Sequence, residues 1–230
     1  MSKKKETAEA IMLALKEHYG SAECTLDFKN GWQLLFSAIL AAQCTDERVN
    51  KVTAVMYEEW PRLEDYAAAS QEEIEEKVKS CGLYRNKAKN IKASAEDLLA
   101  RFEGEVPREM DELLSLPGVG RKIANLMLGD YFGVPGVVVD THCKRITRLL
   151  GLSKEENPAK IEKDIEKVLA PEHWIDWGHF LVRHGREICQ ARCRKCLICP
   201  LRERDLCKYA KTKAKTLAKL EEEGDLDACC

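Results

Sequence analysis

The chain has 230 residues, 45% of them hydrophobic, and a formal net charge of −2 at neutral pH. This composition is typical of a folded protein with a sizeable core, and it argues against a uniformly basic nucleic-acid binder. The first twenty residues mix Lys and Glu with apolar residues, so we expect no signal peptide. No apolar run reaches the roughly twenty residues that a membrane helix needs. We therefore expect a cytoplasmic protein.

Apolar residues recur at spacings of three and four along most of the chain, which predicts an all-α fold. Thr45-Asp46 is typical of a helix start, and Gly82 and Gly151 are typical of helix ends. The one strand-like stretch, GVVVD at 136–140, is too short to build a sheet, and we interpret it as an extended connector that delivers Asp140. In chain order, helices are expected at 6–19, 31–43, 46–59, 70–80, 84–102, 109–115, 121–132, 141–150, 158–169 and 174–189.

The sequence LPGVGRK, residues 116–122, lies between two expected helices. Gly118 and Gly120 allow positive φ or close backbone approach, and the N–H groups that open the next helix favour an anion such as phosphate. For the glycines alone, a plain helix–helix turn is the simpler interpretation. Lys122 lies at the positive end of the helix dipole, which disfavours the ammonium form. This position favours a nucleophilic lysine able to form a Schiff base.

Asp140 ends the apolar run and precedes Thr141 and His142. An aspartate in this position is expected to be partly buried. Taken alone, the pattern favours a helix cap formed by Asp140 or Thr141 over a catalytic carboxylate. We interpret His142 as a structural, hydrogen-bonded residue.

Five of the eleven cysteines lie between residues 189 and 207. Six residues separate Cys189 from Cys196, two separate Cys196 from Cys199 and seven separate Cys199 from Cys207, with Cys193 as an extra thiol. Four thiolates suit either tetrahedral zinc or a [4Fe–4S] cluster, and the single closely spaced pair mildly favours iron–sulfur. Residues 183–215 carry eleven Lys or Arg against three acids, so this part of the chain is basic despite the overall charge.

Together these motifs resemble endonuclease III, a bifunctional DNA glycosylase of the helix–hairpin–helix Gly/Pro–Asp superfamily. The resemblance runs from about residue 8 to residue 209 and is carried by AAQCTD (41–46), GLYRNKAKNI (82–91), LPGVGRK (116–122), VDTH (139–142), HGREIC (184–189) and the cysteine cluster. It implies two helical domains with DNA in the cleft between them. Residues 22–132 would form a six-helix bundle with the helix–hairpin–helix motif, and residues 1–21 with 133–230 would carry the iron–sulfur loop.

The resemblance also implies roles for individual residues. Lys122 would attack C1′ of a flipped-out nucleotide and form a Schiff base that leads to β-elimination, with Asp140 stabilising charge on the sugar. A mainly structural [4Fe–4S] cluster would be held by Cys189, Cys196, Cys199 and Cys207. DNA would be contacted by Gln43 and Leu83, which fill the vacated space and wedge the opposite strand, by the hairpin residues Leu116, Gly118, Val119, Gly120 and Arg121, and by the basic residues Arg192, Arg194 and Lys195.

We therefore expect a base excision repair enzyme that removes oxidised pyrimidines from double-stranded DNA and cleaves abasic sites, acting as a monomer, at the nucleoid if bacterial or archaeal. Two alternatives stay open: a mismatch-specific adenine or thymine/uracil glycosylase, and a non-catalytic DNA-binding module. Lys122 weighs against the first and the Lys122–Asp140 pair against the second.

The last cysteine gap of this chain is seven residues, whereas the family usually has five, and the family rarely has a cysteine at the position of Cys193. These departures leave the identity of the four cluster ligands slightly open. The tail 210–230, with Cys229 and Cys230, has no assigned role.

Overall fold

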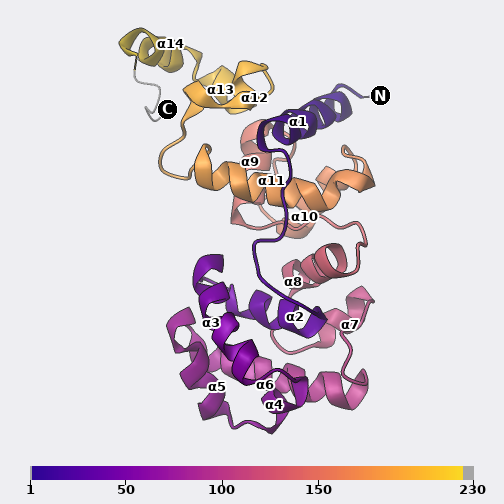
Figure 1. Ribbon diagram of the computed structural model, residues 1–230. Coiled ribbons are helices and arrows are strands. Elements are labelled where there is room, and N and C mark those ends of the chain that lie inside the picture. The colour runs from indigo at the N-terminus through magenta and orange to yellow at the C-terminus, as the bar shows by residue number, and fades with distance from the viewer. Residues whose placement is uncertain (1, 225–230) are drawn as a thin grey trace. The chain divides into compact units, whose positions relative to one another are not determined.

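The computed structural model describes residues 2–224, a range in which the regular structure is helical and no β-strand occurs (Figure 1). This confirms the all-α fold class. The chain forms two compact units, one of residues 24–134 and one of residues 1–23 with 135–230. Cys229 and Cys230 lie outside the described residues. Within the described range, no helix is both long and apolar enough to cross a membrane.

The unit 24–134 is built around α6, Tyr84–Arg101, against which α4 and α5 pack. Its core includes a group of aromatic rings in mutual contact, in which Trp32 and Phe36 of α2 meet Tyr66 of α4 at centroid distances of 5.2–5.3 Å. Burial of each such side chain stabilises the fold by about 1.5–3 kcal/mol. The helices of this unit are α2 Gly31–Leu40, α3 Asp46–Glu59, α4 Leu63–Ala68, α5 Gln71–Val78, α6 Tyr84–Arg101, α7 Met110–Ser115 and α8 Arg121–Leu126, with a 3₁₀ turn at Lys79–Cys81 and a π-helical turn at Met127–Tyr131.

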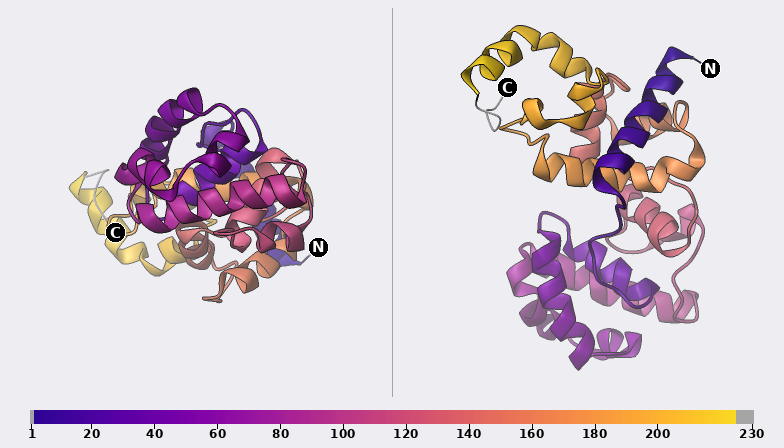
Figure 2. Two further views of the ribbon diagram at one scale, coloured as in Figure 1. Left: turned by 90° about the horizontal axis from the view of Figure 1, so that it is seen from below. Right: turned by 45° about the horizontal axis from the view of Figure 1, so that its top comes forward.

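The unit of residues 1–23 with 135–230 joins the two ends of the chain, because α1 packs against α11 and α12 (Figure 2). Helix α9 packs closely on α11, where a Cβ atom at Gly185 would collide with the ring of His142. Glycine in the HGREIC motif is therefore required for this packing. The helices are α1 Lys3–Tyr19, α9 Thr141–Leu150, α10 Pro158–Glu166, α11 Trp174–Glu187, α12 Pro200–Glu203, α13 Lys208–Thr212 and α14 Ala214–Glu223, with 3₁₀ turns at Pro171–His173 and Cys196–Ile198.

Several expected helix boundaries are corrected by the structure. The helix expected to reach residue 43 ends at Leu40, because Gln43 has a left-handed backbone with φ +54°. The helix expected at 121–132 changes to π-helical geometry at Met127. The short helices α4, α12 and α13 were not predicted. For the tail, the sequence leaves open a final short helix or a frayed end, and α14 shows that residues 214–223 are helical.

Candidate functional site

The turn between α7 and α8 is a hydrogen-bonded β-turn. The N–H of Val119 donates to the carbonyl oxygen of Leu116 at 3.1 Å, and φ of Gly118 is +79°. Proline at the second position and glycine with positive φ at the third are typical of a type II turn. The side chains of Leu116 and Val119 are buried, and the hydroxyl of Ser94 donates to the carbonyl of Pro117 at 2.8 Å. The turn is thus anchored from within its own unit, while both of its glycines are exposed.

Helix α8 starts directly after Gly120, whose carbonyl accepts a hydrogen bond from the N–H of Ala124 at 3.0 Å. Because glycine has no side chain to cap the helix, the first turn of α8 presents main-chain N–H groups outward. Arg121 and Lys122 are exposed in the same turn. The helix dipole and the two cations therefore give this end of α8 a positive potential that suits an anionic ligand.

Gln43 and Leu83 have left-handed backbones that few non-glycine residues adopt. Their φ angles are +54° and +47°. Gln43 lies between α2 and α3, Leu83 directly precedes α6, and both side chains are exposed. Backbone strain of this kind costs roughly 1–3 kcal/mol per residue and is concentrated at functional sites. The strain favours a functional interpretation of these two turns over simple helix-end packing.

Asp140 caps α9 in the unit of residues 1–23 with 135–230. Its carboxylate accepts the main-chain N–H of Cys143 at 2.7 Å, which confirms the expected helix cap. Residues 133–140 form an extended connector rather than a strand, and burial of Val137 and Val139 fixes its end. A carboxylate has two oxygens, so capping by one of them is compatible with a second task. Lys122 belongs to the unit 24–134, and the two residues thus come from different units.

The four predicted cysteines border one pocket, although they come from different segments of the C-terminal region. Cys189 follows α11, Cys196 begins a 3₁₀ turn that Cys199 directly follows, and Cys207 precedes α13. The apolar part of the pocket wall is formed by Ile146, Leu149, Leu150, Ile188, Leu201 and Ala210. Four cysteines around a largely apolar pocket are a donor set that suits an iron–sulfur cluster.

Two polar side chains reach the sulfurs of this pocket. Nε2 of His184 lies 3.6 Å from Sγ of Cys199, and its Nδ1 lies 2.9 Å from the hydroxyl of Tyr19. Burial lowers the pKa of His184 to about 4, so the ring is neutral at pH 7. If the Tyr19 hydroxyl donates to Nδ1, the single N–H of the neutral ring faces Cys199. The Arg145 guanidinium lies 3.8 Å from Sγ of Cys189. Such donors stabilise thiolate ligands.

The oxidation state of the cysteines bears on cofactor binding. Cys189, Cys199 and Cys207 are free thiols, whereas Cys193 and Cys196 are both in disulfide form. Between residues 2 and 224, no three Cys, His, Asp or Glu side chains surround a point that could hold a metal ion. Cys196 can act as an iron ligand only in its thiolate form.

A second pocket of the same unit is lined mainly by cations, with Thr141, Lys144, Arg145, Arg148, Leu149 and Arg194 around it. Glu156 pairs with Lys144 at 2.8 Å and with Arg148 at 2.5 Å, which neutralises part of this charge. Arg194, from the predicted basic loop, also stacks over the ring of Tyr209 at 5.1 Å. The remaining positive charge makes this pocket suitable for a phosphate group.

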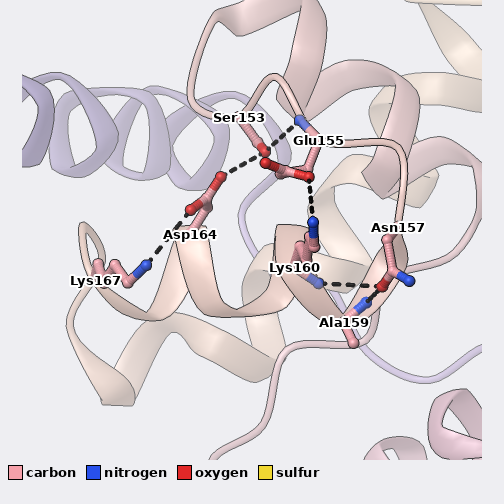
Figure 3. Close-up of polar contacts among 7 residues, drawn as sticks. All are labelled: Ser153, Glu155, Asn157, Ala159, Lys160, Asp164 and Lys167. Atoms are coloured by element: carbon pink, nitrogen blue, oxygen red, sulfur yellow. Dashed lines mark hydrogen bonds and ion pairs between the residues drawn. The ribbon is translucent and has the colours of Figure 1, made fainter.

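The loop that carries Glu156 is held in place by polar contacts at the start of α10 (Figure 3). Ser153 donates to the carboxylate of Asp164 at 2.7 Å and accepts the N–H of Glu155 at 3.1 Å. The side chain of Asn157 accepts the N–H groups of Ala159 and Lys160 and so caps the helix. Glu156 therefore projects from a defined loop toward the cations of α9.

Known proteins identify the family of this chain. The family model described as HhH-GPD superfamily base excision DNA repair protein matches residues 36–171. Endonuclease III of Synechocystis sp. is 46% identical over 202 residues, which cover 87% of this chain and 92% of that protein. The chain belongs to the HhH-GPD superfamily.

Two solved structures agree with this assignment. A non-covalent endonuclease III–DNA complex matches with TM-score 0.87 and 38% identity, and a trapped endonuclease III–DNA covalent intermediate with TM-score 0.86 and 38% identity. They cover 94% and 93% of this chain, and this chain covers all of both.

The segment that matches the HhH-GPD model contains the two strained turns, the glycine turn, Lys122 and Asp140. The four pocket cysteines follow it, after residue 171. The family resemblance inferred from the motifs is confirmed.

Lys87 and Arg145 were not predicted as site residues. Lys87 is buried at 3% exposure, and its ammonium group donates to the carbonyl oxygens of Leu40 and Cys81, which end two helical segments of the unit 24–134. Its spacing from Tyr84 and Ile91 places a lysine on the apolar face of α6, which is a signal that the sequence does contain. Arg145 reaches the carbonyl of Cys189 across 44 residues of sequence, a contact that no local pattern indicates.

Two substitutions in the glycine turn separate folding from DNA binding. Gly118→Ala is expected to destabilise the protein by about 1–3 kcal/mol, because φ is +79° and a Cβ atom would lie within 2.9 Å of the side chain of Asn90. Gly120 has φ −98° and open space around it, so Gly120→Ser is expected to keep or raise the Tm. The new hydroxyl would cap the same N–H groups that a phosphate needs, and the Kd for duplex DNA should rise about tenfold.

Thermal melting and fluorescence anisotropy with a labelled duplex measure both effects. If Gly120→Ser binds duplex DNA as tightly as the wild type, the first turn of α8 does not hold a phosphate.

Proposed function

We propose that this protein is a bifunctional DNA glycosylase and abasic-site lyase of base excision repair, acting on oxidised pyrimidines in double-stranded DNA. The observation that carries the proposal is the anchored type II turn that leads directly into a helix with an exposed Lys122 in its first turn. Identity of 46% to an endonuclease III over 87% of the chain supports the class of enzyme. The trapped covalent endonuclease III–DNA intermediate, from a protein 38% identical, supports a covalent route.

In this mechanism the main-chain N–H groups at the start of α8, together with Arg121, hold a backbone phosphate. Gln43 and Leu83 enter the duplex where the damaged nucleotide has left the stack. Their exposure and strained backbones support this role. The basic pocket beside Arg194 holds a further phosphate.

The chemical step needs a neutral amine at Lys122. Its nitrogen attacks C1′ and forms the C1′–N bond, while the bond from C1′ to the base breaks and the base leaves with the electron pair. Ring opening gives a Schiff base. Loss of a proton from C2′ then expels the 3′ phosphate and cuts the strand. Asp140 stabilises positive charge on the sugar and transfers protons.

The test is to incubate the wild-type protein with duplexes that carry thymine glycol, a uracil mismatch or an abasic site, and to measure base release and strand cleavage separately. The proposal predicts base release from thymine glycol and cleavage at the abasic site. Preference for the mismatch would favour the alternative of a mismatch glycosylase. Binding without base release or cleavage on any duplex would favour a DNA-binding module.

We infer that the reduced forms of Cys189, Cys196, Cys199 and Cys207 hold a [4Fe–4S] cluster. Their position around one pocket, and the His184 and Arg145 donors beside two of them, support this ligand set. When bound, the cluster would cross-link the loop 189–207 and help to hold its cations against DNA.

The extra thiol provides a matched control for this ligand set. After reduction and anaerobic incubation with iron and sulfide, the wild type and Cys193→Ser are expected to bind about four irons per chain, whereas Cys196→Ser is expected to lose the cluster. Iron and acid-labile sulfide analysis measures the outcome, together with the brown colour of the protein. Loss of iron in Cys193→Ser but not in Cys196→Ser would exchange the two assignments.

A further inference from the structure

Lys87 is a buried cation in the unit 24–134. It lies on α6 with 3% of its surface exposed, and burial lowers the pKa of its amine. The ammonium group donates to the carbonyl oxygen of Leu40 at 2.8 Å and to that of Cys81 at 2.7 Å. Burying a charge is unfavourable unless hydrogen bonds compensate for lost water, and an apolar side chain would fill the space without that penalty. The presence of a buried lysine at this position is therefore better explained by the two chain segments that its hydrogen bonds connect.

Its two acceptors each end a helical segment that leads into a strained turn. Leu40 is the last residue of α2, three residues before Gln43, and Cys81 ends the 3₁₀ turn two residues before Leu83. An ammonium group at the carbonyl end of a helix also interacts favourably with the helix dipole. Lys87 thus holds both turns from inside the unit.

A second contact joins the same two turns. The thiols of Cys81 and of Cys44, the residue after Gln43, lie close enough to interact electrostatically. Cys81 is buried and Cys44 packs against the same core. The turns that carry Gln43 and Leu83, residues 41–45 and 81–83, are therefore joined by Lys87 and lie near each other at Cys44 and Cys81, although about forty residues separate them along the chain.

We propose that Lys87 is a positioning residue that holds these two turns at a fixed separation, so that Gln43 and Leu83 enter the DNA together. The proposal rests on the function proposed above. One residue fills the space left by a flipped nucleotide while the other wedges the opposite strand, and both must do so at the same base-pair step of the duplex. If the two turns already have the right spacing, binding does not have to pay the entropic cost of ordering them independently. The strained backbones of Gln43 and Leu83 need such support from the surrounding structure.

The test compares Lys87→Met with Lys92→Met. Lys92 lies on the same helix, and its ammonium group also donates to two main-chain carbonyls, those of Ala67 and Ala69, both at 2.8 Å. Those carbonyls belong to α4 and the residue after it, away from the two turns. Lys92→Met therefore removes one lysine and two hydrogen bonds to main-chain carbonyls, together with an ion pair to Glu96 at 3.0 Å, without affecting residues 41–45 or 81–83.

Two dissociation constants are measured for each folded variant, one with a duplex that contains a tetrahydrofuran abasic analogue and one with the same undamaged duplex. Lys87→Met is expected to lower the preference for the abasic duplex about tenfold or more, with affinity for undamaged DNA within about twofold of the wild type. Lys92→Met should keep the wild-type preference. Fluorescence of 2-aminopurine beside the abasic analogue should also fall in Lys87→Met only, since it reports unstacking.

Equal preference in Lys87→Met and the wild type would overturn the proposal, and so would an equal loss for both duplexes. Lys87→Arg keeps a cation and serves as a second variant if Lys87→Met fails to fold. Its guanidinium group is expected to donate to the same two carbonyl oxygens, so Lys87→Arg should keep the wild-type preference for the abasic duplex. A wild type without any preference for the abasic duplex would instead contradict the proposed function.

Discussion

Replacing Lys122 with glutamine is expected to reduce cleavage at an abasic site by roughly 10³-fold or more, because the amine that forms the Schiff base is lost. The side chain is exposed in the first turn of α8, so the Tm should stay close to that of the wild type. Binding to a duplex with an abasic analogue should be retained, with only the modest loss expected from removing one of the two cations at the start of α8, since the N–H groups of the turn are unaffected. Single-turnover cleavage and anisotropy titration measure the two quantities.

Lys51→Gln is a suitable control for the first variant. Lys51 is also an exposed lysine of the unit 24–134, and its pair with Glu47 at 2.7 Å lies on the surface of α3. Cleavage by this variant should match the wild type. Comparable cleavage by Lys122→Gln and the wild type would mean that another amine is the nucleophile.

Replacing Asp140 with asparagine is expected to slow base release about 10²–10³-fold with little change in stability. Asparagine caps helices as well as aspartate does, so the bond to the N–H of Cys143 can be kept while the charge is removed. The expected loss therefore reports the carboxylate and not the cap. Single-turnover release of thymine glycol and thermal melting provide the measurements.

Asp140→Ala complements this variant in separating the role of Asp140 as a helix cap from its role as a catalytic carboxylate. It removes both the charge and the cap, and should lose about 1 kcal/mol of stability in addition to the loss of activity. If Asp140→Asn releases base at the wild-type rate, Asp140 acts only as the cap of α9 and takes no part in catalysis.

Helices with strong local signals were predictable from the sequence. Thr45 accepts the N–H of Arg48, and Gly151 ends α9 with φ +82°, so the bounds of α3 and α9 agree with the prediction. Helix α4 carries weaker signals: Arg62 and Asp65 form its capping contacts, a pairing that the usual Ser, Thr, Asp or Asn cap pattern does not include. The π-helical turn after Leu126 depends on packing and has no simple sequence pattern.

The candidate site was predictable where a motif is local. The type II turn follows from Pro117 and Gly118, and the cap on α9 from Asp140. The contacts of Lys87 join α6 to two other segments through the fold, and only the helical spacing of Lys87 from Tyr84 and Ile91 hints at them. The contact of Arg145 with the carbonyl of Cys189 likewise has no signal in the local sequence. Contacts between distant segments require the structure.

The most direct test of the central claim is to trap the wild-type protein on an abasic-site duplex with borohydride, digest the adduct and locate the modified residue by mass spectrometry. We predict a reduced sugar adduct on the peptide that contains Lys122. An adduct on another lysine or on the N-terminal amine, or no adduct under conditions in which the strand is cut, would contradict the assignment.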